Sequence, residues 1–365
     1  MSAAPIQPPE VPPYQFQVLI PEVFSEIIRA SSPSTKALCA QAHGSEVYVG
    51  CSNGELLRFS LQTNNPNAPE SYTLLSRQSL PNDKPIDELV LVPSLGRVLV
   101  LSDHQIHFYT LPALDPVSPQ VIKPIRNVVT FAVDDQHLRR PPMLSSDVPQ
   151  RVDPVEFCVI KRSTISMYSL RERLFFQKEV PLPNGATLAR RSGRYMCVAD
   201  QKNYNMIDLQ EAQMFPLLPL SQAFDSDVAV KPHITVVSPM EFLILSWTGS
   251  NTLGVFITGE GEAVRGTLEW PSHPESVCLD YPYIATLLPN NTIEIHNVDT
   301  QNIVQVVPAP PGSEDRTRLV WSANGFMVPS YQRSEKLKAV RVPLRRMQAS
   351  TKRTHEDQLA SEMGS

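Results

Sequence analysis

The side chains of this chain that could bind a metal ion or act as nucleophiles are scattered along the sequence. There are eight histidines and five cysteines, and the cysteines stand singly within apolar runs, at Cys39, Cys51, Cys158, Cys197 and Cys278. A zinc site needs about four clustered ligands, and a redox pair needs a C-x-x-C motif. The sequence shows neither pattern. We therefore predict no metal site, and we interpret the cysteines as reduced, buried thiols.

Motifs for phosphate binding and acyl transfer are also missing. The sequence has no Walker loop, no G-x-S-x-G elbow and no S-x-x-K. Gly259-Glu260-Gly261 resembles half of a dinucleotide-binding fingerprint, but the third glycine is misplaced, and we interpret the segment as a hairpin turn. We accordingly predict no catalytic residue and no cofactor, and a protein that is not an enzyme.

Two arginine pairs are the candidate partner-binding residues. Arg139 and Arg140 fall in the polar, Pro-rich stretch 134–154, which is interpreted as a mobile loop insertion. Arg190-Arg191 is placed in a hairpin-like turn. Either pair could meet an acidic partner, although solvated loop residues are the commoner explanation of such pairs. Arg139 and Arg140 are the preferred contact residues, because a mobile basic insertion can adapt to an acidic surface.

Composition limits the class of protein. The chain has 365 residues, a formal net charge of -5 and a pI near 5.9, which argues against a nucleic-acid footprint. No apolar stretch approaches the roughly 18 residues of a membrane span, and the N-terminus lacks the features of a secretory signal. The expected location is therefore the cytoplasm. The 35 prolines against 14 glycines favour many turns and few long helices.

A repeat organises the chain and predicts its fold. Apolar runs such as EVYVG (46–50) and EFLIL (241–245) are each followed by a turn and an alternating run, GELLRFSL and NTLGVFIT in these two cases. The alternating runs begin about 40 to 60 residues apart, near the period of propeller repeats. We predict an all-β protein, a β-propeller of about seven four-stranded blades, closed by a strand within 14–23. Two stacked β-sandwiches are the alternative, but they do not require a repeat.

The predicted boundaries follow from this repeat. The propeller spans 14–347, with the loop insertion at 134–154. A disordered Pro-rich segment covers 1–13, and a disordered polar tail covers 348–365.

Three segments resemble citron-homology (CNH) domains. They are RYMCVADQKNYNMIDLQEAQMFPLLPLS (194–221), EFLILSWTGSNTLGVFITGEGEAVRGTLEW (241–270) and YPYIATLLPNNTIEIHNV (281–298). The last two are most similar to the vacuolar-sorting branch, which includes the TGF-beta receptor-associated protein and its fungal counterpart in the CORVET tethering complex. A related branch occurs in the HOPS complex.

This resemblance implies a non-enzymatic interaction domain in endosome-to-vacuole vesicle tethering. The implied partners are a Rab-type small GTPase and other tethering-complex subunits, with peripheral membrane association only through partners and no nucleic acid. One alternative is a citron-homology signalling module that binds Rho-family GTPases or kinases. Another is a propeller enzyme with its site at the central channel, but the repeats supply no converging catalytic set.

Overall fold

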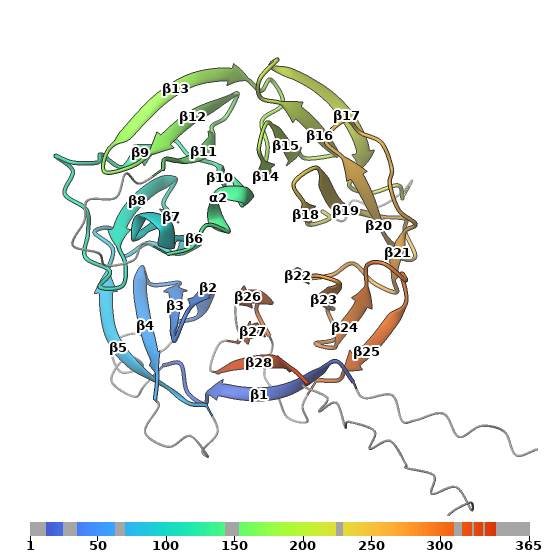
Figure 1. The fold of residues 1–365 in the computed structure, drawn as a ribbon, viewed down its shortest axis with the longest axis horizontal. Helices are drawn as coiled ribbons and strands as arrows, with labels where there is room; N and C mark the ends of the chain where they lie inside the picture. The colour runs from blue at the N-terminus through green and yellow to red at the C-terminus, as the bar shows by residue number, and fades with distance from the viewer. Residues whose placement is uncertain are drawn as a thin grey trace, which may run out of the picture.

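A computed structural model describes residues 12–24, 35–62, 70–142, 153–223, 229–309, 316–322, 325–330 and 333–340. Its strands form seven four-stranded antiparallel sheets arranged radially around a central axis (Figure 1). This confirms the predicted propeller of seven four-stranded blades. Residues 1–11 of the predicted segment 1–13, residues 143–152 of the predicted insertion 134–154 and the whole predicted tail 348–365 lie outside the described residues. The propeller limits 14–347 remain predictions.

The first three blades follow one another in chain order. Blade 1 contains β2 (Ala37–His43), β3 (Glu46–Cys51), β4 (Glu55–Leu61) and β5 (Tyr72–Ser79). Blade 2 contains β6 (Ile86–Val92), β7 (Arg97–Ser102), β8 (Gln105–Thr110) and β9 (Ile125–Arg126). Blade 3 contains β10 (Thr130–Val133), β11 (Val155–Ile160), β12 (Thr164–Leu170) and β13 (Leu174–Pro181).

The next three blades continue the ring. Blade 4 contains β14 (Leu188–Ser192), β15 (Tyr195–Ala199), β16 (Asn203–Asp208) and β17 (Gln213–Pro219). Blade 5 contains β18 (Ile234–Ser238), β19 (Glu241–Trp247), β20 (Thr252–Thr258) and β21 (Leu268–Trp270). Blade 6 contains β22 (Ser276–Asp280), β23 (Tyr283–Leu287), β24 (Ile293–Asn297) and β25 (Ile303–Val307).

Blade 7 joins the two ends of the propeller. It contains β26 (Val320–Ser322), β27 (Gly325–Pro329), β28 (Ser334–Ala339) and, as its outer strand, β1 (Tyr14–Ile20). β1 pairs antiparallel with β28, from Tyr14 opposite Ala339 to Ile20 opposite Ser334. This confirms the prediction that an N-terminal strand closes the ring. Closure removes the free edge that β28 would otherwise present.

The core is divided among the gaps between neighbouring blades. Seven clusters of buried apolar residues each combine side chains of two adjacent blades. Trp270 illustrates the tight packing: its indole Nε1 donates a hydrogen bond to Thr286 Oγ1 of blade 6 at 2.8 Å. A Cβ added to Gly254 would lie 2.7 Å from the Trp270 ring, so only glycine fits there. The inner strands of each sheet are thus largely buried on both faces, as radial packing requires, whereas outer strands such as β5 and β13 are mostly exposed.

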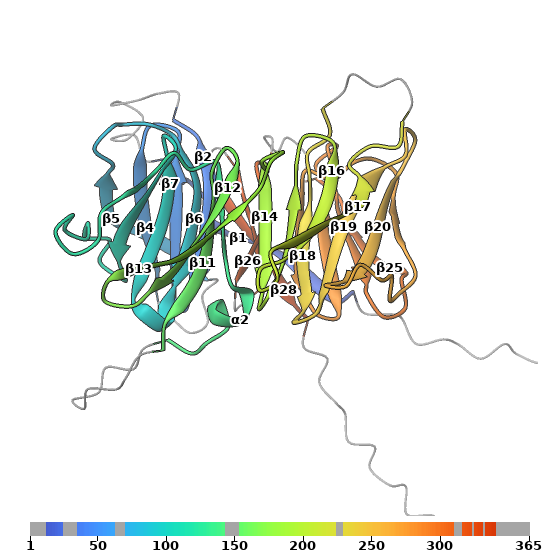
Figure 2. The same cartoon turned by 90° about the horizontal axis from the view of Figure 1, so that it is seen from above.

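Helical structure within the described ranges is limited to the 3₁₀ turn η1 (Pro93–Leu95) and the short helix α2 (Asp135–Leu138). α2 connects β10, the innermost strand of blade 3, to β11. Figure 2 shows α2 at one end of the ring, and Figure 1 shows it close to the central axis. The inner strand of a blade borders the channel, so a helix that follows it is held at the channel mouth.

Candidate interaction surface around helix α2

Asp134 is the first residue that holds α2 in place, although the sequence predicts that it lies in a mobile loop. Asp134 is instead only 2% exposed, and its Oδ1 caps the helix by accepting a hydrogen bond from Gln136 N at 3.1 Å. The same oxygen accepts from Gly193 N of blade 4, also at 3.1 Å. The start of the predicted insertion 134–154 is therefore a fixed structure, because one carboxylate joins the helix to the neighbouring blade.

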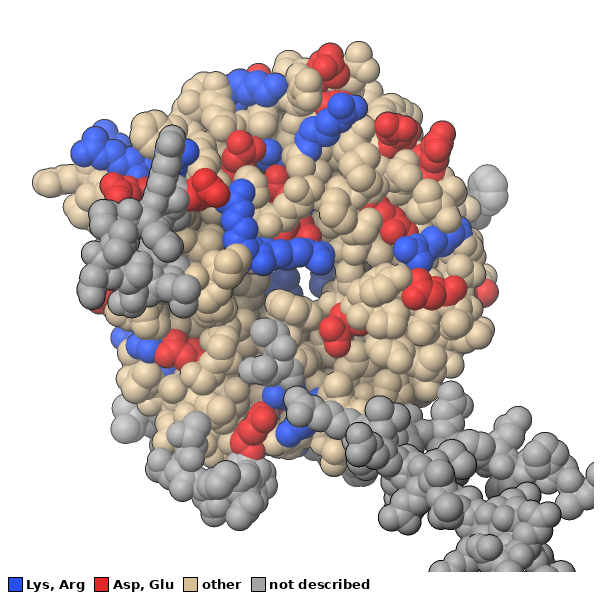
Figure 3. All heavy atoms as spheres, viewed as in Figure 1, with Lys and Arg blue, Asp and Glu red and all other residues tan. Residues whose placement is uncertain are grey.

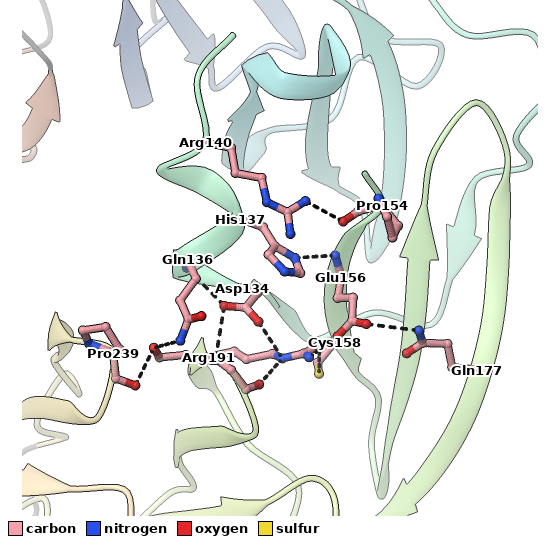
Figure 4. Close-up of polar contacts among 12 residues, drawn as sticks. Asp134, Gln136, His137, Arg140, Pro154, Glu156, Cys158, Gln177, Arg191 and Pro239 are labelled. Atoms are coloured by element: carbon pink, nitrogen blue, oxygen red, sulfur yellow. Dashed lines mark hydrogen bonds and ion pairs between the residues drawn. The ribbon is translucent and has the colours of Figure 1, made fainter. Parts of the chain in front are cut away.

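An ion cluster beneath the helix ties blade 3 to blade 4 (Figure 4). The Arg191 guanidinium, 4% exposed, lies 3.6 Å from Asp134 Oδ2 and also pairs with Glu156 on β11. Its Nε donates to Gly193 O at 2.9 Å, and its Nη1 approaches Cys158 Sγ at 3.7 Å. A buried guanidinium is tolerable only when carboxylates and hydrogen bonds surround it.

These contacts correct the prediction that Arg190-Arg191 is a solvated turn. Both residues lie in strand β14, and Arg191 is buried. Successive side chains of a strand point to opposite faces, so the two arginines have different neighbours. The sequence alone could not reveal this, because the partners Asp134 and Glu156 come from the preceding blade.

The titration behaviour of the cluster reflects this environment. Burial alone would lower the pKa of Arg191, but Cys158, Asp134 and Glu156 outweigh it and raise that pKa. Burial opposes the charge on Glu156, yet Arg191 outweighs it and lowers the pKa of Glu156. Burial also raises the pKa of the Cys158 thiol to about 11. The arginine and Glu156 are thus charged near neutral pH, while the thiol is protonated.

Two further contacts attach the helix to the start of β11. His137 Nδ1 accepts a hydrogen bond from Glu156 N at 3.0 Å, which requires that nitrogen to be unprotonated. Arg140 Nη1 donates to Pro154 O at 2.7 Å. The helix is therefore fixed on both sides, to β11 of its own blade and to blade 4.

Of the predicted contact residues, Arg139 is the more accessible. Its side chain is 58% exposed and makes an i,i+4 ion pair with Asp135, with Nε 2.6 Å from Oδ2. Arg140 is half-buried. The two predicted residues thus lie side by side directly after a rigid helix rather than within a mobile loop. Their role in binding remains a prediction.

The turns around α2 extend the surface. Gln136 Nε2 donates to Ser192 Oγ at 3.5 Å, and Ser192 Oγ donates to Pro239 O at 2.9 Å. These bonds connect α2 to the turns at 193–194 and 239–240, which expose Arg194 and Met240. We call α2, Arg139, Arg140 and these two turns the α2 surface. Figure 3 shows Lys and Arg side chains gathered at the central opening on this side of the ring.

The described residues give no sign of a cofactor centre. In them, no group of three or more His, Cys, Asp or Glu side chains is arranged to hold a metal ion. Gly259-Glu260-Gly261 lies in the connection from β20 to β21, where Gly261 N donates to Thr258 O at 3.0 Å, so it is a turn as predicted. No helix in the described ranges has the length and hydrophobicity of a transmembrane segment.

The fold and the α2 surface together define this class of protein: a seven-bladed β-propeller with basic side chains at one mouth of its channel. Residues 43–316 match the CNH domain family, and the chain belongs to that family. The chain is 25% identical over 300 residues to human transforming growth factor-beta receptor-associated protein 1. It is 23% identical over 324 residues to vacuolar protein sorting-associated protein 3 of Saccharomyces cerevisiae. The predicted resemblance to the vacuolar-sorting branch is therefore confirmed.

These matches cover most of this chain but a minority of each relative. They include 80% and 86% of this chain, and 32% and 29% of the respective relatives, so the chain spans about a third of their length. A lesser similarity, 23% identity over 261 residues, connects 66% of the chain to 19% of Rho1 guanine nucleotide exchange factor 1 of Schizosaccharomyces pombe. The solved AfRom2 CNH domain has the same fold, with a TM-score of 0.55, 17% identity, and coverage of 90% of this chain and 99% of that domain.

Proposed function

We propose that this chain is a non-enzymatic interaction domain in endosome-to-vacuole vesicle tethering. Its similarity to vacuolar protein sorting-associated protein 3 over 86% of the chain is the observation that carries this proposal. The proposed partners are a Rab-type small GTPase and other subunits of a CORVET-like or HOPS-like tethering complex. The domain would be cytoplasmic and would reach endosome or vacuole membranes only through these partners.

The α2 surface is the proposed contact for the GTPase. Arg139 is exposed, and the helix before it is anchored to two blades. An anchored basic group loses little conformational entropy when it meets an acidic partner. Loops on a rigid scaffold commonly carry binding residues, and α2 with its flanking turns has that form.

The test uses the full chain, immobilised, against a panel of Rab and Rho proteins loaded with GTP or GDP. We expect binding to at least one endosomal or vacuolar Rab in the GTP state, at micromolar affinity. The double variant Arg139→Ala/Arg140→Ala should weaken that binding about tenfold or more, because arginines at an interface centre are common hot spots.

A matched control is available on the opposite face of the ring. Arg162 and Lys202 are exposed in the β11–β12 and β15–β16 turns, whereas α2 belongs to a β10–β11 connection. Successive turns of antiparallel strands alternate between the two faces, so these residues lie on the other side. Arg162→Ala/Lys202→Ala should therefore leave Rab binding unchanged.

A Rho-directed signalling role is the second candidate, favoured by the similarity to the Rho1 exchange factor. The same panel separates the two functions. GTP-dependent binding to a Rho protein, without binding to any Rab, would replace the tethering proposal with the signalling one. Equal losses for the α2 and the control variants would reject the α2 surface as the contact.

A further inference from the structure

A second surface feature lies where blade 6 meets the closing blade. It is a groove with a volume of about 400 Å³, and its walls include Pro13, Tyr14, Asp280, Tyr281, Tyr283 and Val340. Figure 1 shows β1, in blue, beginning beside β25, in orange, at this junction. The 280–283 turn connects the first two strands of blade 6, as α2 does in blade 3, so both lie on the same face of the ring.

Three tyrosines give the groove its aromatic wall. Tyr14 is buried, and its ring meets that of Tyr283 edge-on with centroids 5.7 Å apart. Tyr281 is 54% exposed at the rim. Two of the hydroxyls are held in place: Tyr14 donates to Asp280 Oδ2 at 2.9 Å, and Tyr281 donates to Asp299 Oδ1 at 2.7 Å. Rings fixed in this way can receive a ligand at low entropic cost.

The backbone beneath the tyrosines is equally well held. Gln305 of β25 accepts from Tyr14 N at 2.9 Å and donates to Tyr14 O at 2.8 Å. Val340 N donates to Pro13 O at 2.8 Å. Pro12 and Pro13 form part of the wall, so prolines of the chain itself already share this aromatic groove. The groove is a built part of ring closure.

The charge of the groove limits the kind of ligand that it can bind. Among the described residues that line it, Asp280 is the one that carries a charge. The Tyr14 hydroxyl contacts one carboxylate oxygen of Asp280, and the residue is partly exposed. A ligand that combines an apolar, ring-rich segment with one cation would match both the tyrosine wall and this carboxylate.

We propose that this groove binds an extended, proline-rich segment of another protein that carries a basic residue beside its prolines. Proline-rich segments dock in aromatic-lined grooves because their polyproline II conformation is already formed and proline rings pack on tyrosine faces. Asp280 then selects the basic residue. This site is separate from the α2 surface, so it adds a second kind of partner to the proposed domain.

The experiment measures fluorescence anisotropy of a fluorescein-labelled peptide, Arg-Pro-Pro-Leu-Pro-Pro, with the full chain. We expect a Kd of about 10 to 500 μM, a range usual for short single-motif ligands. Replacing the four prolines by alanine should weaken binding at least tenfold. Replacing the arginine by glutamate should weaken it at least fivefold for the wild type, and less than twofold for Asp280→Asn.

Two variants of Tyr281 separate the contribution of its ring to binding from that of its hydroxyl. Tyr281→Ala should abolish measurable binding, whereas Tyr281→Phe should retain it within twofold, since the ring supplies the contact. Phe175→Ala removes an equally exposed aromatic ring on β13 and serves as the matched control. No binding at 1 mM protein, or equal binding of the proline and alanine peptides, would overturn the proposal. Self-association that Tyr281→Ala abolishes, without peptide binding, would assign the groove to a second copy of the chain instead.

Discussion

Arg190 and Glu88 meet across the central channel, with Nη2 3.6 Å from Oε1, although a whole blade separates their strands in the ring. The next residue, Arg191, turns the other way and enters the buried cluster with Asp134 and Glu156. Consecutive arginines therefore have different energetic roles. One makes a partly exposed pair at the channel, and the other makes a buried joint between blades 3 and 4.

The first prediction contrasts these two arginines. Arg191→Ala leaves Asp134 and Glu156 without their buried counter-charge and should lower the free energy of unfolding by about 3 to 5 kcal/mol. Arg190→Ala removes a long, partly exposed ion pair and should cost less than about 1 kcal/mol. Urea unfolding followed by tryptophan fluorescence measures both values. Similar costs for the two variants would show that the Arg191 cluster does not stabilise the joint.

The second prediction concerns closure of the ring. Deleting residues 1–20 removes β1 and the buried side chains of Tyr14, Leu19 and Ile20, each worth about 1.5 to 3 kcal/mol. It also exposes the edge of β28 to other chains. We expect loss of a cooperative thermal transition and aggregation in light scattering.

Deletion of residues 1–11, which leaves β1 intact, is the control and should preserve the transition. A synthetic peptide covering residues 12–20, added in trans, should restore it to the 1–20 deletion. If the 1–20 deletion unfolded cooperatively at the wild-type temperature, β1 would contribute nothing to closure.

The sequence predicted the fold well because the middle strands of each blade are strongly patterned. EFLIL (241–245) lies within β19, and GELLRFSL begins one residue before β4. Some outer strands are harder to recognise in the sequence, because β9 has two residues and β21 has three. Strands so short carry no periodicity that a sequence pattern can detect. The blade count was therefore predictable, but the extent of each blade was not.

The candidate surface was only partly predictable. Arg139 and Arg140 were identified from charge, but α2, with four residues, is too short to show helical periodicity. The Asp134–Arg191 pair joins positions that are 57 residues apart in the sequence. Nothing local in the sequence marks such a pair, because its partners are brought together by the packing of adjacent blades.

The third prediction concerns acid stability. Burial lowers the pKa of His296 to about 4 and that of His233 to about 3, so both are neutral in the folded protein. In the unfolded chain each has a pKa of about 6.5. Below that pH the unfolded state binds protons that the folded state does not, so stability is complete above about pH 6.5 and falls towards pH 4. Protonation of His296 in the unfolded chain should by itself lower the free energy of unfolding by about 2 kcal/mol at pH 5 relative to pH 7.5.

The comparison of wild type with His296→Phe isolates this effect. Burial raises the pKa of Glu294, which acts in the opposite direction and remains in both proteins. His296 is buried and its ring packs on Trp270 with centroids 5.0 Å apart, so phenylalanine suits the position. Urea midpoints at the two pH values should differ less in the variant. An unchanged pH dependence would contradict the assignment.

The last prediction concerns the five cysteines, all of which are buried free thiols. Burial raises the pKa of Cys39 to about 12 and that of Cys158 to about 11, so at pH 8 only about 10⁻³ or less of either is the reactive thiolate. Labelling with a bulky disulfide reagent should therefore follow global unfolding. Cys197→Ser should lower the free energy of unfolding by about 1 to 3 kcal/mol, more than Cys197→Ala, because it places a hydroxyl in an apolar cluster. Rapid labelling of four or five thiols in the native protein would refute the buried arrangement.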